Sequence, residues 1–220
     1  MNQPEERTNA SRELPFQRLR DFRENGGTIS NTPYTKMIEY NNQRNFNMEF
    51  INHSYKYLCL SDKIHELEVF GVMVCICQLI YEYEDGFRTM HKQCVTDGYY
   101  RGLANTVVSK GTEIYYISHY HPLYIKDNIK KKDYVYGKIY MMAATALWSN
   151  KSVRYIQGSV CFGTKMTLFA ATKTEDGGIV IYPDEDEYDM NDPKIPRIMY
   201  SFKEKYQDNI QDDNDSETRD

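Results

Sequence analysis

The most apolar stretch of the chain runs from Leu67 to Tyr83 and reads LEVFGVMVCICQLIYEY. It is rich in valine, isoleucine and cysteine, and a hairpin-type turn signal, Glu84-Asp85-Gly86, follows it. A short apolar run bounded by turn signals is typical of a strand covered on both faces, although a buried helix shows the same periodicity. We interpret the stretch as a strand, and the predicted fold depends on this interpretation.

Period-two alternation favours strands on both sides of this stretch. Upstream, polar and apolar residues roughly interleave at residues 34–40, and Phe46, Met48 and Phe50 alternate strictly with polar neighbours, which indicates half-buried strands. Tyr55, Tyr57 and Cys59 continue the same pattern. Downstream, further strand-like segments lie at residues 111–125, 134–140, 153–172 and 179–182. The segment at 153–172 is long enough for two strands and is predicted to be a hairpin.

The composition favours sheet as well. Twenty of the 220 residues are tyrosines, whose flat rings pack well on a pleated surface. In the body of the chain a helix is predicted only at residues 141–147, which are rich in alanine and methionine. Short strands separated by turn signals are typical of sandwiches and barrels. We therefore predict an all-β or β-rich α+β fold: one antiparallel, jelly-roll-like sandwich with at most one or two short helices.

The chain is expected to form a single domain with polar ends, since β-sandwiches commonly run to about 200–250 residues. Residues 1–32 alternate acidic and basic side chains before a turn signal, which predicts a flexible N-terminal arm. Residues 33–203 are expected to form the sandwich. Residues 204–220 are acidic and poor in apolar side chains, so we predict a disordered tail.

Cysteine usage and hydropathy indicate a soluble, intracellular protein. The five cysteines are an odd number and none lies in a CxxC pair, so reduced thiols are expected. The first 25 residues are polar and carry no signal-peptide pattern. The longest apolar run is too short for a transmembrane helix, and no membrane contact is predicted.

The charge of the chain is unevenly distributed. The net charge is −5, but residues 126–165 have a local balance of +6 and residues 175–220 one of −10. Both segments are interpreted first as solvated surface, and alternatively as segments that contact each other or a partner. Within the basic segment, Lys130, Lys131 and Lys132 lie between two tyrosines. A contact with nucleic acid through Lys126 to Lys138 is therefore a further hypothesis.

Two histidines, His119 and His121, lie two residues apart on a predicted strand. Alternate strand residues point to the same face, so the pair has the spacing of two ligands of one metal ion. His91 or Glu113 would be the third ligand. The alternative interpretation is a pair of polar residues on the exposed face of an edge strand, with Pro122 marking its end. No metal or other cofactor is predicted.

A cysteine between two glycines, in Gly158-Ser159-Val160-Cys161-Phe162-Gly163, raises the possibility of a nucleophile. Trypsin-like viral cysteine proteases hold such a cysteine in a tight glycine turn, with an upstream histidine as base. His53 or His65 would qualify by chain order. The valine and phenylalanine beside Cys161 instead favour a buried strand, so we predict a core residue. No catalytic residue is assigned.

One acidic run has some features of the calcium-binding pattern of an EF-hand loop: Asp184-Glu185-Asp186-Glu187-Tyr188-Asp189. That pattern needs an oxygen ligand at its fifth position and glycine at its sixth, where Tyr188 and Asp189 stand here. The acidic run therefore does not predict a calcium site.

Two segments resemble the closing strands of jelly-roll capsid proteins from picorna-like RNA viruses. They are Val69-Phe70-Gly71-Val72-Met73-Val74-Cys75 and the tyrosine-rich Gly111-Thr112-Glu113-Ile114-Tyr115-Tyr116-Ile117-Ser118-His119-Tyr120. The usual proline of the second strand is missing, and the N-terminal arm lacks the basic character of many coat proteins. The resemblance implies a structural, self-assembling role in a virion or in the host cytoplasm.

A shorter segment, Val135-Tyr136-Gly137-Lys138-Ile139, is similar to part of the poxin family of viral and insect nucleases that cleave a cyclic dinucleotide. The family's metal-free mechanism needs a histidine near the N-terminus and a Tyr-x-x-x-Lys pair shortly after this segment. Here the first histidine is His53, and residues 140–144 offer no such pair. The resemblance therefore does not carry the activity over.

The predicted function is non-enzymatic. We expect a structural or self-assembling protein, viral coat-like, or a protein-interaction module that binds itself or another protein. Closed assembly would cover exposed strand edges. The rival hypothesis is a small β-barrel hydrolase, either a cysteine protease using Cys161 or a divergent, poxin-like nuclease.

Overall fold

The computed structural model describes residues 20, 22–24, 26–38, 44–60, 64–81, 85–97, 100–121, 129–150 and 152–206, with side chains except at 129–131. Most of the predicted arm and tail falls outside these residues, so both stay predictions. Pro122 and Lys126 also lie outside them.

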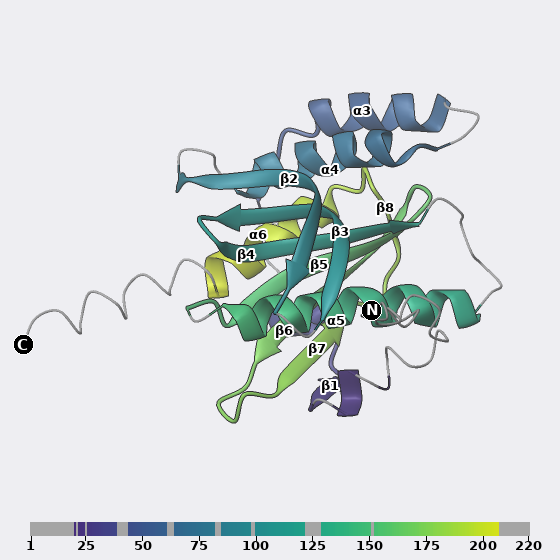
Figure 1. The fold of residues 1–220 in the computed structure, drawn as a ribbon. Coiled ribbons are helices and arrows are strands. Elements are labelled where there is room, and N and C mark those ends of the chain that lie inside the picture. The colour runs from purple at the N-terminus through teal and green to yellow at the C-terminus, as the bar shows by residue number, and fades with distance from the viewer. Residues whose placement is uncertain are drawn as a thin grey trace, which may run out of the picture.

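One open, mixed sheet forms the centre of the described chain (Figure 1). Its strands follow the order β1-β7-β6-β5-β4-β3-β2, and β8 pairs with the start of β6. The strands are β1 (Gly27–Ile29), β2 (Phe87–Thr96), β3 (Arg101–Lys110), β4 (Glu113–His121), β5 (Tyr155–Phe162), β6 (Lys165–Lys173), β7 (Ile179–Pro183) and β8 (Tyr188–Asp189).

Strand directions divide the sheet into two antiparallel halves. β2, β3 and β4 form one antiparallel meander, and β5, β6 and β7 form another. The halves join through the parallel pair β4 and β5, in which Tyr116 lies opposite Gln157. At one edge β1 adds a parallel strand to β7, with Gly27 opposite Ile179. The predicted sandwich is therefore wrong, because the strands form one open sheet.

Helices cover both faces of this sheet (Figure 1). α5 lies across one face and contacts the strands from β2 to β7. α4 and α6 lie on the opposite face, and α3 packs against the outer side of α4. The helices are α2 (Tyr34–Ile38), α3 (Glu49–Leu60), α4 (Glu66–Ile80), α5 (Ile129–Ser149) and α6 (Lys194–Tyr206). The protein is thus α+β, with far more helix than predicted.

The apolar stretch from Leu67 to Tyr83 is not a strand, and most of it belongs to α4. The helix begins at a capping box in which the Glu68 carboxylate accepts a hydrogen bond from the His65 backbone N–H. Its buried residues recur at helical intervals of three and four: Val69, Val72, Met73, Ile76, Cys77 and Ile80. α3 and β2 cover parts of the remaining surface of α4, which is why apolar side chains occur on more than one side of this helix.

The capsid-like interpretation loses its structural basis with this correction. Its first segment, Val69 to Cys75, lies inside α4, and only the second segment is a strand, β4. Similarly, the poxin-like segment from Val135 to Ile139 lies within α5.

Four further strand predictions are also wrong. Residues 34–38 of the predicted strand at 34–40 form α2, and Tyr55, Tyr57 and Cys59 lie in α3. The alternation at residues 46–50 precedes and enters α3, whose first turn is capped by the Asn47 side chain accepting a hydrogen bond from the Glu49 N–H. The segment at 134–140 belongs to α5, where Val135, Ile139 and Met142 recur at helical spacing and are buried. The helix predicted at 141–147 is confirmed as part of α5.

The remaining strand predictions are confirmed. The 153–172 hairpin corresponds to β5 and β6, and 179–182 to β7. β4 occupies most of the predicted strand at 111–125, but it lies between β3 and β5 and is not an edge strand.

Each face of the sheet carries its own buried cluster. Tyr116 belongs to the cluster under α2, α4 and α6, whereas its neighbour Ile117 belongs to the cluster under α5. This alternation follows from the period of two along a strand. The N-terminal part joins in as well, because Tyr34 in α2 and Phe22 are fully buried.

Candidate functional site

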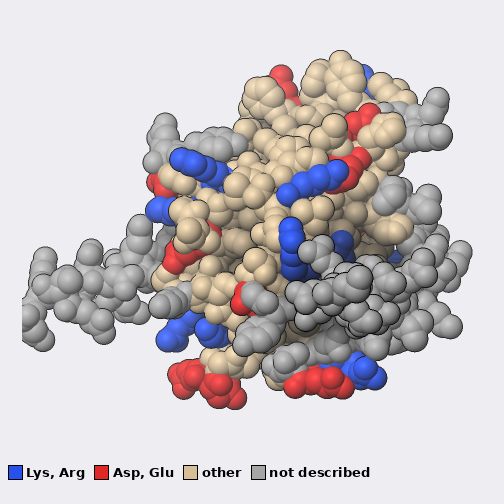
Figure 2. All heavy atoms as spheres, viewed as in Figure 1, with Lys and Arg blue, Asp and Glu red and all other residues tan. Residues whose placement is uncertain are grey.

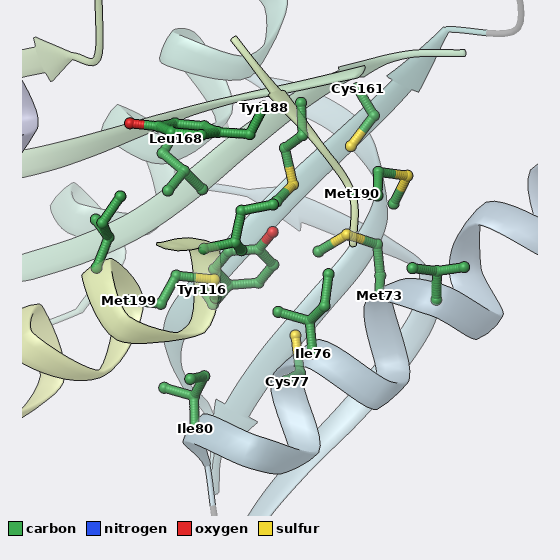
Figure 3. Packing of buried hydrophobic residues seen from close by; sticks show 14 of the residues in the cluster. Met73, Ile76, Cys77, Ile80, Tyr116, Cys161, Leu168, Tyr188, Met190 and Met199 are labelled. Atoms are coloured by element: carbon green, nitrogen blue, oxygen red, sulfur yellow. The ribbon is translucent and has the colours of Figure 1, made fainter. Parts of the chain in front are cut away.

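Cys161 is a core residue, as predicted, and does not form a catalytic pair. It lies in β5, is 1% exposed, and points into the cluster that also contains Met73 and Met190 (Figure 3). Burial raises the pKa of its thiol to about 12, so the nucleophilic thiolate is disfavoured. Both proposed bases, His53 on α3 and His65 before α4, are exposed. This geometry gives the cysteine-protease hypothesis no support.

His119 and His121 share one face of β4, the face covered by α5. Lys138 of α5 places its Nζ 3.5 Å from His119 Nε2, and the His121 ring lies 6.1 Å from that of Phe162. The shared face agrees with the prediction, but the edge position does not. The half-buried pair therefore packs beneath a helix.

The proposed third metal ligands lie elsewhere. His91 in β2 packs its ring on Phe70 of α4, on the face opposite α5. Glu113 accepts a hydrogen bond from the Tyr115 hydroxyl at the start of β4. Within the described ranges no group of three or more His, Cys, Asp or Glu side chains is arranged to hold a metal ion.

The acidic run after β7 contributes to structure. The buried carboxylate of Asp184 accepts hydrogen bonds from the Tyr188 hydroxyl at 2.8 Å and from the Glu185 N–H at 2.9 Å. Asp189 in β8 accepts from Lys165 at 2.8 Å and from the Tyr55 hydroxyl at 3.1 Å. These contacts attach the segment to β6 and α3.

The basic segment is only partly described. Lys130, Lys131 and Lys132 lie in the first turn of α5, and the side chain of Lys132 lies 3.9 Å from Glu187 and 5.6 Å from the Phe162 ring centre. Contact between the basic and acidic segments was one of the alternatives, and this ion pair is an example. Binding of nucleic acid through Lys126 to Lys138 stays a prediction.

A polar cluster around Glu66 was not anticipated. Its Oε1 lies 2.6 Å from Asn105 Nδ2 and 3.2 Å from His91 Nε2, and its Oε2 lies 3.1 Å from Lys92 Nζ. Desolvation raises the pKa of Glu66, but the hydrogen bonds and the Lys92 charge outweigh it, so the net pKa is lowered. Glu66 therefore acts as an ionised acceptor that joins α4 to β2 and β3.

Lys92 in this cluster has an unusual backbone. Its φ of 51° makes it the one non-glycine residue with positive φ in the described part of the chain. The β2–β3 ladder has no pair at Lys92 and Asn105, and Asn105 Oδ1 instead accepts a hydrogen bond from the Tyr120 N–H. The cluster thus kinks the long edge strand, which limits its pairing with other strands.

The outer surface of α3 exposes large apolar side chains. Phe50 and Leu60 are 71% exposed, Tyr57 is 62% exposed, and Leu67 at the start of α4 is 67% exposed. The His53 ring lies edge-on to Tyr57 at 4.9 Å. We call these five residues (Phe50, His53, Tyr57, Leu60 and Leu67) the α3 surface. In Figure 2, uncharged side chains predominate at the top of the view, where Figure 1 places α3.

The opposite side of α3 packs against the protein core. Ile51 and Leu58 are fully buried, and the Ser54 hydroxyl lies 3.5 Å from the Cys75 sulfur of α4. Since the inner side already anchors α3, the outer apolar residues are not needed to hold it in place. Exposed apolar residues grouped in this way mark a surface for another molecule.

The sequence contains a signal for this surface. Phe50, His53, Tyr57 and Leu60 lie at intervals of three and four, the period of one helix face. The strand prediction at Phe50 rests on Phe46 and Met48, which precede it at period two.

Comparisons of the chain with protein-family models, with curated proteins and with solved structures found no match. In the described ranges, no helix has both the length and the hydropathy that crossing a bilayer requires. The evidence for function therefore comes from the chain's own surfaces and contacts.

Proposed function

We propose that this protein is a non-enzymatic self-association module whose contact surface is the α3 surface. The observation that carries the proposal is the exposure of four large apolar side chains, 62–71% each, on adjacent helices. Transferring such side chains from water into an interface is the main source of association free energy.

The second copy is the partner that the exposed residues fit. Two-fold homodimers are the commonest soluble oligomers, and they use the same patch on both copies. The α3 surface is mostly apolar and has Glu49 and Lys56 exposed beside it, so the surface offers both charges to a copy of itself. The sheet edges offer less, because β1 has three residues and β2 is kinked at Lys92.

Sedimentation of the purified chain over a wide concentration range tests the proposal. We expect a monomer–dimer equilibrium, and we expect the double substitution Phe50→Ser with Leu60→Ser to leave only monomer. Both side chains are exposed in the monomer. At concentrations that leave the parent protein monomeric, the free energy of unfolding of the variant should therefore lie within about 0.5 kcal/mol of that of the parent.

Leu103→Ser is the matched control. Leu103 is 48% exposed on β3, outside the α3 surface, and its substitution should not change the dimer. A wild-type chain that stays monomeric at millimolar concentration would refute the proposal. Loss of the dimer in the Leu103 variant as well would show that the contact lies elsewhere.

A further inference from the structure

We infer that the two copies pair through antiparallel α3 helices, with the two-fold axis beside His53. The inference rests on the proposed self-association and specifies its geometry. It comes from the positions of one apolar pair, Phe50 and Tyr57, and one charged pair, Glu49 and Lys56, all exposed on α3.

The helix places these two pairs on opposite sides of His53. An α-helix turns about 100° and rises about 1.5 Å per residue. Phe50 and Tyr57 therefore lie about 40–60° to one side of His53, and Glu49 and Lys56 about 40–60° to the other. Along the axis, each pair has one member about 4.5–6 Å before His53 and one about 4.5–6 Å after it.

When two α3 helices pack antiparallel about a two-fold axis, the first residue of each residue pair lies opposite the second residue of the same pair in the other copy. In this arrangement the apolar pair of one copy lies on the same side of the interface as the apolar pair of the second, and the same holds for the charged pair. The two helices run in opposite directions. Phe50 of one copy then lies opposite Tyr57 of the second, and Glu49 lies opposite Lys56, each within about 1.5 Å along the axis. Every contact occurs twice, with His53 of both copies at the centre.

A parallel pair would lose this match. In a parallel pair the apolar side of one helix lies against the charged side of the second. Phe50 of one copy then faces Glu49 of the second, and Tyr57 faces Lys56. Apolar rings would then cover charged groups, and no ion pair would form. The antiparallel arrangement instead stacks ring against ring and charge against opposite charge, and the charged flank fixes the register.

The remaining apolar residues fit the same arrangement. Leu60 lies about 10.5 Å beyond His53 along the helix, and Leu67 follows at the start of the antiparallel neighbour α4. Symmetry places one such leucine group at each end of the pair. The apolar contact is thereby extended on both sides of the axis, and it closes with two copies.

Charge reversal tests the geometry. In the antiparallel dimer, the substitution Glu49→Lys places a lysine opposite Lys56 of the second copy at both symmetric contacts. The substitution Lys56→Glu likewise places a glutamate opposite Glu49 of the second copy at both contacts. Each variant should dimerise roughly three- to thirtyfold more weakly than the wild type, since two exposed ion pairs are lost. Equal amounts of the two variants, one of them fluorescently labelled, should form a heterodimer of near wild-type affinity in analytical ultracentrifugation.

The double variant Glu49→Lys with Lys56→Glu is the matched control. It carries both substitutions but restores opposite charges in the antiparallel pair, so its homodimer should recover. If the mixture and the double variant stay as weak as the single variants, the antiparallel pairing is wrong while self-association stands. If the wild type itself does not dimerise, the proposed function fails first.

Discussion

The two faces of the sheet are built differently. Under α5 a large apolar cluster is covered by a single long helix, and polar contacts among the described residues, such as those of Lys138 with His119 and of Tyr136 with Thr167, are few. Under α2, α4 and α6 the buried cluster surrounds polar groups that bond to one another. The face under α5 depends mainly on close packing of side chains. The opposite face also depends on hydrogen bonds, which position α2, α4 and α6.

Gln157 is the centre of the polar face. Its Oε1 accepts a hydrogen bond from the Tyr34 hydroxyl at 3.0 Å, and its Nε2 donates to the Tyr81 hydroxyl at 3.0 Å and to the Met199 carbonyl at 2.9 Å. One side chain of β5 thus connects α2, the end of α4 and α6. Nearby, the Tyr116 hydroxyl lies 2.6 Å from Ser159 Oγ.

The adjacent residue Gly158 serves the apolar face. A Cβ at this position would lie 2.1 Å from Cζ of Phe169, so the strand must have glycine here for the ring to fit. Phe169 in turn lies edge-on to Tyr140 of α5, with ring centres 5.2 Å apart. Neighbouring residues of one strand therefore show both modes of packing.

The largest effect is expected from emptying the apolar face. Phe169→Ala should lower the free energy of unfolding by about 3–5 kcal/mol, because it removes a buried ring and leaves a cavity. Urea denaturation measures the change. At protein concentrations that leave only monomer, Phe50→Ala removes the same ring from an exposed site and should cost less than about 0.5 kcal/mol. Equal effects at both sites would contradict the description of this core.

Overfilling the same face should cost less. Gly158→Ala should destabilise the protein by about 1–3 kcal/mol, since the new Cβ collides with Phe169. The cost should shrink when Phe169 is alanine, and a double-mutant cycle measures this coupling. Additive effects would show that the collision with the ring is not the cause.

A cut in the polar network is expected to have a similar or slightly smaller effect. Gln157→Leu leaves the Tyr34 and Tyr81 hydroxyls and the Met199 carbonyl without this partner, at a cost of about 1–3 kcal/mol in unfolding free energy. Asn52→Leu, at an exposed position of α3, is the control and should change stability by less than about 0.5 kcal/mol. If Gln157→Leu left the free energy of unfolding unchanged, this face of the sheet would depend on the packing of its side chains alone and not on these hydrogen bonds.

The smallest effect concerns pH. Burial raises the pKa of Asp184, so the folded protein keeps this proton to higher pH than the unfolded chain does. The stability that it contributes is present at acid pH and is lost as pH rises through the folded pKa. Asp184→Asn should therefore gain stability relative to the wild type as pH rises from acid toward neutral in urea titrations.

Asp176→Asn is the control of opposite sign. A hydrogen bond from the Thr174 hydroxyl, with others from backbone N–H groups, lowers the pKa of exposed Asp176. Its contribution is present at neutral pH and is lost as pH falls through the folded pKa. This variant should lose stability relative to the wild type as pH rises, and the same trend in both variants would contradict the assignment.

The sequence predicted the strands of the C-terminal half better than the helices. β5, β6 and β7 alternate or run between clear glycine turns, so local pattern and final structure agree. α4 has a valine- and isoleucine-rich sequence that favours strand locally, and its burial on the sheet outweighs that propensity. The helix predicted at 141–147 was right but short, since the tyrosines before it resemble a strand.

The candidate site was harder to predict than the fold. Cys161 was correctly interpreted as a core residue because apolar neighbours surround it in the sequence. For Phe50, Tyr57 and Leu60, spacing can indicate one helix face, but only the packing of α3 on α4 decides whether that face is covered. The Glu66 cluster joins residues from three elements, so no local sequence pattern predicts it.

The pairing of β1 with β7 has a consequence for biosynthesis. It joins Gly27 to Ile179, so more than a hundred residues must leave the ribosome before this strand can find its partner. The β2–β4 meander has only short connections and can form much earlier. Among the described strands, β1 is therefore synthesised first but is among the last to enter the sheet, and the nascent chain carries it unpaired until β7 has left the ribosome.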